Sequence, residues 1–222
     1  MREVSFKSLI PGFPYKTIFG GFGYSSVSLI SDGKCNIIFD VGHYAVRKEM
    51  VKILKKYKIN KVFLSHLHYD HCLNIDLFLN KGIDIYLNRK EWVYLKKIKP
   101  SDIYYFRFFN KIVKRGQIIL FDKEFNITKN VRVLETIGHT AGHSSLSFIR
   151  KGERYIIAGD AIKTYQDFKK INQSDLIPYD YKKFVATKEH IINNFDVIVP
   201  GHSNIIKNGK CSVKNKLLLK HF

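Results

Sequence analysis

The sequence contains few cysteines and no long apolar run. Its 222 residues include three cysteines, Cys35, Cys72 and Cys211, which are too few and too widely spaced for a disulfide framework or a Cys-x-x-Cys site. No run of about 18 apolar residues occurs, and the first residues include no apolar segment of signal-peptide length. We therefore expect a soluble, cytoplasmic protein that does not enter a membrane.

The sequence also lacks linkers and repeats. No stretch rich in proline, glycine and serine divides the chain, and no segment recurs. The apolar fraction of 45% and the aromatic fraction of 14% are typical of a folded globular protein rather than a disordered one. Because a chain of this length can bury a substantial core, we predict a single domain that spans residues 1–222.

Acidic residues are scarce. Asp and Glu total 19 against 38 Lys and Arg, which gives a formal net charge of +19. Such a charge can mark a surface that binds nucleic acid. However, only eight of the basic residues are arginine, whose planar fork suits phosphate and base recognition, and the many lysines look more like a bias toward A/T-rich codons. We therefore expect a small-molecule substrate, with nucleic acid as the alternative partner.

Apolar residues recur at helical spacing in some segments and form short runs in others, which predicts helices and strands in mixed order. Val46, Met50, Ile53, Leu54 and Tyr57 have the spacing of one helical face. The predicted helices are Ala45–Tyr57, Asn74–Asn80, Arg89–Ile98 and Tyr181–Asn193, and the predicted strands are Val4–Phe6, Ser26–Ser31, Asn36–Asp40, Lys61–Ser65, Ile83–Leu87, Ile118–Phe121, Val131–Thr136, Ser145–Arg150, Tyr155–Ala158 and Val197–Val199. This mixture suggests two sheets between outer helices, although the alternation would equally allow a three-layer nucleotide-binding fold.

The most informative motif is His66-x-His68-x-Asp70-His71. It follows the apolar run at residues 62–64, so a buried strand is predicted to deliver four polar side chains to one place. Imidazole and carboxylate together suit zinc, and also manganese or iron. The motif therefore predicts a metal site.

Matching polar residues recur far downstream. His139 and His143 follow one predicted strand, Asp160 ends another after Gly159, and His202 follows a third. Because glycine allows the backbone to come close to a site, the glycines beside these residues favour a shared location.

This ordered set resembles the metallo-β-lactamase-fold hydrolase superfamily. Asp40, in Phe39-Asp40-Val41-Gly42, matches the first motif of that superfamily. The resemblance implies an α/β fold, the αββα sandwich, with two mixed sheets flanked by helices and two metals at one edge. It also implies that His66, His68 and His139 hold the first metal, that Asp70, His71 and His202 hold the second, and that Asp160 bridges both. Two zinc ions per chain are expected, with iron or manganese as alternatives.

The resemblance further implies roles in catalysis. The metals would share and activate a hydroxide, while Asp70 and Asp160 would be catalytic, Asp70 by orienting the nucleophile or protonating the leaving group. Asp40 would orient a metal-bound histidine from behind, unless it is only a turn residue at a strand end. His143 would either line the site or make a structural hydrogen bond.

Differences from known subfamilies narrow the expected reaction. True zinc β-lactamases usually have a cysteine where this chain has Asp160, and diiron flavoproteins of this fold have a glutamate in place of His68. The gap between Asp160 and His202 is too short for the extra domain of the long nucleases. The resemblance thus favours a compact hydrolase of esters, lactones or thioesters. A nucleic-acid or nucleotide phosphodiesterase and a mononuclear iron sulfur dioxygenase are the alternatives.

Substrate choice in such folds is made by loops around the metals. The candidate loops are residues 19–24, the aromatic run at residues 104–109 and residues 163–165, and the glycines at 20–23 predict a hairpin turn. The aromatic run could form a pocket wall or a stacking platform for bases. It could equally belong to the core or to a homodimer contact.

Overall fold

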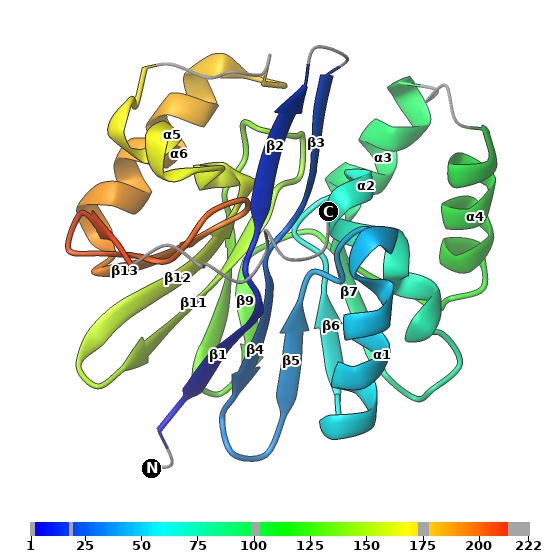
Figure 1. The fold of residues 1–222 in the computed structure, drawn as a ribbon. Coiled ribbons are helices and arrows are strands. Elements are labelled where there is room, and N and C mark those ends of the chain that lie inside the picture. The colour runs from blue at the N-terminus through cyan, green and yellow to red at the C-terminus, as the bar shows by residue number, and fades with distance from the viewer. Residues whose placement is uncertain (1–2, 18–19, 99–102, 173–177, 213–222) are drawn as a thin grey trace.

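Two mixed β-sheets face each other, and each carries helices on its outer side (Figure 1). The structure is a computed structural model that describes residues 3–17, 20–98, 103–172 and 178–212. The six-stranded sheet has the order β1 (Ser5–Ile10), β4 (Val27–Ser31), β5 (Asn36–Phe39), β6 (Lys61–Phe63), β7 (Asp84–Asn88) and β8 (Ile119–Phe121). The seven-stranded sheet has the order β15 (Lys210–Cys211), β14 (Ile206–Lys207), β13 (Val197–Pro200), β12 (Glu153–Gly159), β11 (Ser144–Arg150), β10 (Val131–Glu135) and β9 (Phe125–Thr128).

The helices complete a four-layer sandwich. On the six-stranded sheet lie α1 (Arg47–Lys56), α3 (Arg89–Ile98) and α4 (Ile103–Lys114), and on the seven-stranded sheet lie α5 (Tyr165–Lys169) and α6 (Tyr181–Asn194) (Figure 1). Shorter helical turns are η1 (Tyr44–Val46), α2 (Tyr69–Cys72), η2 (Leu73–Leu77) and η3 (Asp160–Ile162). This arrangement confirms the predicted αββα sandwich and excludes the three-layer alternative. In the described part of the chain, no helix has the length and hydropathy needed to cross a membrane.

Three apolar layers hold the sandwich together. The central layer fills the space between the sheets and includes Phe39 and Phe63, which stack with ring centroids 5.7 Å apart. A second layer lies under α1, α3 and α4, and a third lies under α6 and includes Ile191. Strands buried on both faces explain the continuous apolar runs of the sequence, such as Val197–Pro200.

Strand direction determines where the polar motifs meet. Strands β5, β6, β7 and β8 are parallel to one another, and β12 is parallel to β13. The carboxyl ends of parallel strands lie at the same edge of a sheet, and ligands commonly bind there. The motif residues follow β5, β6, β10, β12 and β13, so they gather at the top edge of the sandwich in Figure 1.

The aromatic run at residues 104–109 was expected in a loop near the metals, and this prediction is wrong. The run lies on α4, where Phe109 is buried and Phe106 stacks on Trp92 at 5.9 Å between ring centroids. Residues 106, 109, 112 and 113 pack against the core with helical spacing, so the described phenylalanines of the run belong to the apolar face of a helix. Neither the pocket-wall nor the base-platform interpretation survives for these packed side chains.

Two smaller predictions are also corrected. Residues 20–23 do not form a turn, because they belong to β3 (Gly20–Tyr24), which pairs with β2 (Phe13–Thr17) in a separate two-stranded sheet. The helix expected at Asn74–Asn80 is instead the 3₁₀ turn η2, since Asn74 has non-helical backbone angles and its side chain donates to the Val41, Gly42 and His43 carbonyls. The first segment is thus part of a local pair of strands, whereas the second is shaped by hydrogen bonds to a distant part of the chain.

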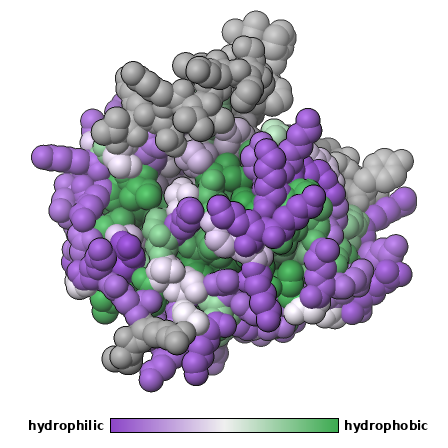
Figure 2. Space-filling view, turned by 60° about the horizontal axis from the view of Figure 1, so that its bottom comes forward, coloured by the Kyte–Doolittle hydropathy of each residue, from purple (hydrophilic) through white to green (hydrophobic). Residues whose placement is uncertain are grey.

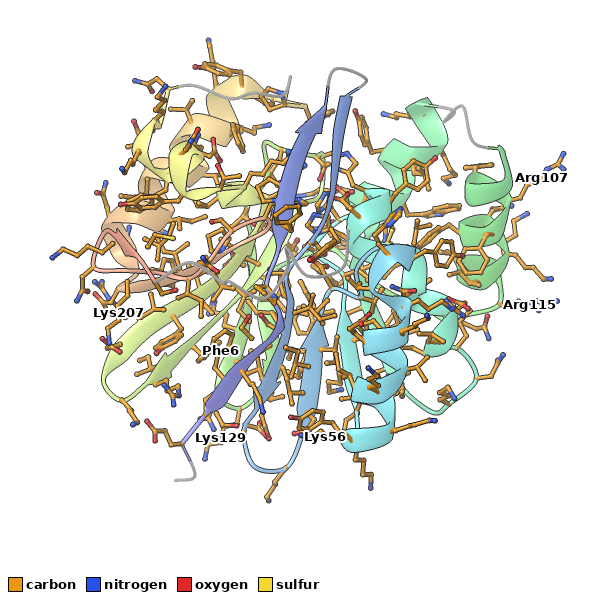
Figure 3. All side chains as sticks on the ribbon, in the orientation of Figure 1. Phe6, Lys56, Arg107, Arg115, Lys129 and Lys207 are labelled. Atoms are coloured by element: carbon orange, nitrogen blue, oxygen red, sulfur yellow. The ribbon has the colours of Figure 1, made fainter. Side chains whose placement is uncertain are left out.

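Hydrophilic residues are spread over the face seen in Figure 2, with apolar residues between them. Arg107 and Arg115 project outward from the α4 side of the molecule, and Lys207 projects outward on the opposite side (Figure 3). The basic side chains labelled in Figure 3 thus include residues on opposite sides of the molecule.

Candidate metal centre

Polar side chains from both sheets converge at the top edge. All seven residues predicted to bind metal fall into two groups, and within each group the donor atoms lie within 4.8 Å of one another. The first group, which we call site 1, contains His66, His68 and His139 together with Asp160, and the second, site 2, contains Asp70, His71 and His202. The tertiary structure thus brings together residues that are up to 136 positions apart.

Three imidazole nitrogens meet in site 1. The Nδ1 atom of His68 lies 2.9 Å from Nε2 of His66 and 3.1 Å from Nε2 of His139. Zinc–nitrogen bonds of about 2.0–2.1 Å in tetrahedral geometry place neighbouring nitrogens roughly 3.3 Å apart. The spacing in site 1 is close to that value, so one metal ion can accept all three nitrogens.

The protonation of site 1 suits metal binding. Burial lowers the pKa of His66 and of His139 well below the ordinary value for histidine, so both rings are neutral at pH 7. The Ser65 hydroxyl donates to Asp40 and lies 2.9 Å from Nδ1 of His66. Since that oxygen can accept a hydrogen bond from Nδ1, the lone pair of His66 is on Nε2 and faces the site.

Asp160 faces both sites at once. Its Oδ2 atom lies 3.4 Å from Nε2 of His139 in site 1, and its Oδ1 atom lies 3.3 Å from Nε2 of both His71 and His202 in site 2. Gly201 packs against this carboxylate, and a Cβ atom at Gly201 would overlap Oδ1 of Asp160. The glycine therefore allows the β13 loop to approach the carboxylate that lies between the sites.

Site 2 is rich in carboxylate. Oδ2 of Asp70 lies 3.1 Å from Nε2 of His202 and 3.8 Å from Nε2 of His71. Burial lowers the pKa of His202, but the Asp160 and Asp70 carboxylates outweigh it and raise the value to about 9. Burial also lowers the pKa of His71. The carboxylates of Asp160, Asp70 and Asp40 outweigh burial and raise this pKa well above the ordinary value. Site 2 is therefore a place where positive charge is strongly favoured.

Several buried polar atoms in this region have no hydrogen-bond partner among the described residues. They are Nε2 of His71, Oδ1 of Asp160 and both ring nitrogens of His202. Buried polar atoms without a partner are rare and call for an explanation such as a bound ion. A divalent cation would satisfy the three atoms that face one another, and it would supply the positive charge that the carboxylates favour. The donor set thus fits the binding of divalent metal.

Asp40 lies directly behind site 2. It is fully buried at the end of β5, its Oδ2 accepts from Nδ1 of His71 at 2.7 Å, and its two oxygens accept from the Ser65 amide and hydroxyl at 2.8 Å. Its φ of 55° is in the left-handed region, where aspartate is tolerated better than most residues. The carboxylate orients the His71 ring so that Nε2 faces Asp160, which is the positioning contact that the sequence suggested.

His143 does not belong to either group of donors. Its Nε2 atom accepts from the Asp160 amide at 3.1 Å, and its Nδ1 atom lies 2.8 Å from the Thr136 hydroxyl. Burial lowers the pKa of His143 to about 3, so the ring is neutral. Of the two interpretations open from the sequence, the structural hydrogen bond is the one observed, since His143 holds the backbone of Asp160.

Glu91 is a functional candidate that sequence reasoning missed. This α3 residue is 2% exposed, and its carboxylate accepts from the Gly142 amide at 2.7 Å and from the Leu67 amide at 3.2 Å. It therefore ties the loop of His66 and His68 to the loop of His139. A glutamate in the first turn of a predicted helix looks like an ordinary surface residue, so no local signal distinguishes it.

A buried ion pair supports the opposite side of the site. Lys188 on α6 has a fully buried side chain, and its ammonium lies 2.6 Å from Oδ1 of Asp167. Oδ2 of Asp167 accepts from the Lys163 amide, and the Lys163 carbonyl accepts from the His202 amide at 2.7 Å. This chain of contacts connects α6 to the loops of Asp160 and His202, and the charge pattern of α6 did not indicate it.

Comparisons with known proteins agree with this geometry. The family model of the metallo-beta-lactamase superfamily matches residues 20–202. A "probable metallo-hydrolase" of Methanocaldococcus jannaschii is 27% identical over 200 residues, which cover 83% of this chain and 91% of that protein. The structure of a "probable metal-dependent hydrolase" from Staphylococcus aureus superimposes with a TM-score of 0.72 at 16% identity and covers 94% of this chain and 95% of that one. An N-acyl homoserine lactone hydrolase with the product N-hexanoyl-L-homoserine at its catalytic metal center superimposes with a TM-score of 0.67 at 16% identity and covers 91% of this chain and 93% of that one.

Proposed function

The chain belongs to the metallo-beta-lactamase superfamily, and from this premise we propose that it is a hydrolase that uses two metal ions to cleave an ester, lactone or thioester bond. The observation that carries the proposal is the Asp160 carboxylate, which presents one oxygen to site 1 and the other to site 2. A carboxylate so placed can hold two cations next to each other, as a two-metal hydrolytic site requires.

The proposal assigns a role to each group of residues. His66, His68 and His139 would hold the first ion, Asp70, His71 and His202 the second, and Asp160 both. When bound, the metals, which we expect to be zinc, would lower the pKa of a water molecule and polarise the bond under attack.

Asp70 is the residue proposed to orient the nucleophile. Burial raises the pKa of its carboxyl, but His71 and His202 outweigh this effect and hold the pKa well below the ordinary value. Its side chain is 29% exposed, whereas that of Asp160 is 3% exposed. A carboxylate that stays ionised and is partly exposed can accept a hydrogen bond from the attacking water and so orient it toward the substrate.

The substrate class rests on two further arguments. The fold neighbour that hydrolyses a lactone binds its product at a metal center, so lactones are reasonable first candidates for this chain. The carboxylate at position 160 disfavours antibiotic hydrolysis, because true zinc β-lactamases usually have cysteine there. Esters and thioesters have the same polarised carbonyl, so we propose them as substrates for the same reason.

The experiment that tests this proposal combines metal analysis with a panel of substrates. The protein is purified without added metal, its metal content is measured, and it is then assayed with lactone, ester, thioester, phosphodiester and short RNA substrates. We expect about two metal ions per chain and turnover of at least one carbonyl substrate.

Each alternative gives a different result. One iron per chain with oxygen consumption would replace the proposal by a sulfur dioxygenase. Cleavage of RNA alone, with an affinity for RNA that falls steeply as the salt concentration rises, would replace the proposal by a phosphodiesterase. The net charge of +19 is the reason to include this test.

A further inference from the structure

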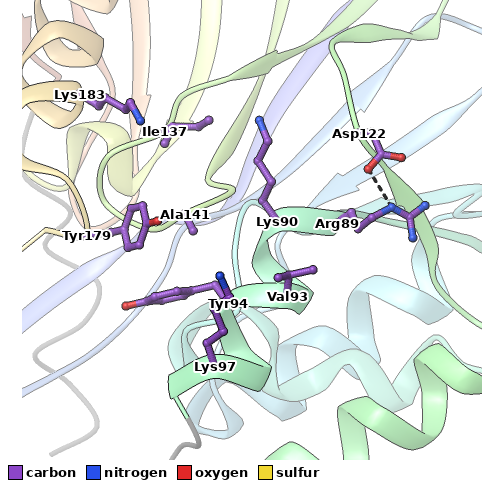
Figure 4. Close-up of a pocket in the computed structure, with 10 residues that line it drawn as sticks. All are labelled: Arg89, Lys90, Val93, Tyr94, Lys97, Asp122, Ile137, Ala141, Tyr179 and Lys183. Atoms are coloured by element: carbon purple, nitrogen blue, oxygen red, sulfur yellow. Dashed lines mark hydrogen bonds and ion pairs between the residues drawn. The ribbon is translucent and has the colours of Figure 1, made fainter.

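A cavity of about 360 Å³ lies beside the loop that carries His139 (Figure 4). Its volume is within the range of about 300–1,000 Å³ typical of small-molecule sites. One face of α3, the His139 loop and the segment that leads into α6 form its walls. None of its lining residues has a role in the proposed metal chemistry.

The cavity adjoins site 1 through the backbone. Ile137 and Ala141 line it, and each is two positions from His139. The Tyr179 amide donates to the His139 carbonyl at 3.1 Å, and the Tyr179 ring forms part of the wall. A molecule in this cavity would therefore touch the segments that position a proposed metal ligand.

Cations outnumber carboxylates in the lining. Arg89, Lys90, Lys97 and Lys183 line the cavity, whereas Asp122 is the one acidic residue among the lining residues. Three of the cations also form exposed ion pairs, Arg89 with Asp122 at 2.8 Å, Lys90 with Glu135 at 2.6 Å and Lys183 with Asp180 at 3.3 Å. Exposed ion pairs are weak, so an anionic ligand can compete for these cations. For Lys97, the described part of the chain offers no ion-pair partner.

The rest of the lining is aromatic and apolar. Tyr94 and Tyr179 meet edge to face, with ring centroids 5.0 Å apart and an interplanar angle of 74°. Tyr179 is 52% exposed and Val93 is 38% exposed, so both have surface to offer to a ligand. Together they suit a molecule with a flat or apolar body and an anionic group.

We propose that this cavity binds the anionic end of the substrate, so that the hydrolase acts on a carbonyl compound that carries a carboxylate or phosphate away from the scissile bond. The inference rests on the proposed function, which supplies the reaction. A cavity of this size fits a small molecule better than a nucleic-acid strand, which would need an extended cationic track.

The test compares two thioesters that differ only in a terminal carboxylate or carboxamide. In the triple variant Lys90→Gln, Lys97→Gln and Lys183→Gln, KM for the carboxylate compound should rise about tenfold or more, because charge-assisted contacts to the anion are lost. Its kcat should stay within about twofold, and KM for the carboxamide compound should not change. The matched control is Arg107→Gln, Lys111→Gln and Lys114→Gln, which removes the same charge from the exposed face of α4 and should alter neither KM.

Binding of adenosine monophosphate to the metal-loaded protein gives a readout that does not depend on turnover. The triple variant in the cavity should bind adenosine monophosphate about tenfold more weakly than the wild type, and the control variant should bind it as the wild type does. Equal KM changes for both thioesters, or equal weakening by both variants, would overturn the proposal. Loss of RNA binding in the cavity variant without any effect on adenosine monophosphate would assign the cavity to nucleic acid instead. If no thioester, ester or lactone is turned over, the proposed reaction fails, while the binding measurement still decides whether the cavity takes anions.

Discussion

The carboxylates at the metal-binding edge differ from those on the outer surface. Asp40, Glu91 and Asp160 are at most 2% exposed, and each contacts a residue or a loop that carries proposed metal ligands. Asp122 and Asp196 are partly exposed and pair with single arginines. Because a buried charge without its partners is far costlier than an exposed one, the few acidic residues of this basic chain are of very unequal importance.

The largest expected effect is at Asp160. Replacing it with alanine should lower turnover by about a thousandfold or more, because both proposed metals lose a shared ligand. Metal content should fall as well, measured on the same samples by elemental analysis. The matched control is Asp84→Asn, which alters an exposed aspartate on β7 and should leave both quantities unchanged. Wild-type turnover in the Asp160→Ala protein would show that this carboxylate does not bridge the two sites.

The second largest effect is expected at the Lys188–Asp167 pair. Lys188→Met should lower the free energy of unfolding by about 3–5 kcal/mol, because it leaves the carboxylate of Asp167 buried without its cation. Urea unfolding of the variant and the wild type gives this difference. Lys207→Met, which breaks the exposed pair with Glu153, should have no measurable effect. If the two variants have similar free energies of unfolding, the buried ion pair contributes no more to stability than the exposed one.

A smaller and more local effect is expected at Asp40. Asp40→Asn should weaken metal binding about 10–100-fold, because an amide cannot accept the His71 hydrogen bond in the same way and the ring loses its orientation. Chelator competition followed by metal analysis measures this loss. Asp76→Asn, which alters an aspartate paired with Arg47 on the surface, is the control. Equal affinity in both variants would reduce Asp40 to a turn residue.

The smallest effect is expected at Asp196. Hydrogen bonds from Arg154 lower the pKa of this exposed carboxyl to about 2. Since the folded-state pKa lies below the ordinary value of 3.8, the pair stabilises the fold above about pH 4, and this contribution is lost as the pH falls toward 2. Asp196→Asn should lower the melting temperature at pH 7 by about 1–2 °C and make no difference near pH 2. If the difference in melting temperature between the wild type and the variant grows as the pH falls, the expected pH dependence is wrong.

Much of the architecture could be predicted from local patterns. The helix predicted at Arg89–Ile98 has the observed bounds, and the strands that precede Asp40, His66, Asp160 and His202 were placed within a few residues. Apolar runs that end in polar ligands are strong signals, because burial and chemistry coincide there. Helix α4 was missed because its first half is rich in aromatic residues, which suit loops, strands and helices alike.

The supporting contacts could not be predicted in the same way. Ser65 and Glu91 bond to residues or backbone atoms that are distant in sequence, and their own neighbours give no sign of it. Lys188 resembles a solvent-exposed lysine on an amphipathic helix until α5 places Asp167 beside it. Such roles depend on the packing of separate elements rather than on spacing along the chain.

The sequence by itself determined the chemistry of this protein: which side chains could bind metal, in what order they occur, and which strands deliver them. Local patterns are sufficient for that, because ligand type and strand burial are encoded within a few neighbouring residues. The resemblance to a known family already implied that Asp160 would bridge the two sites and that Asp40 would orient a ligand. Only the tertiary structure decided that Glu91 and Lys188 would support these sites and that a cationic cavity would lie beside His139. Those features arise where distant segments pack together, and the burial that creates them exists only in the folded chain.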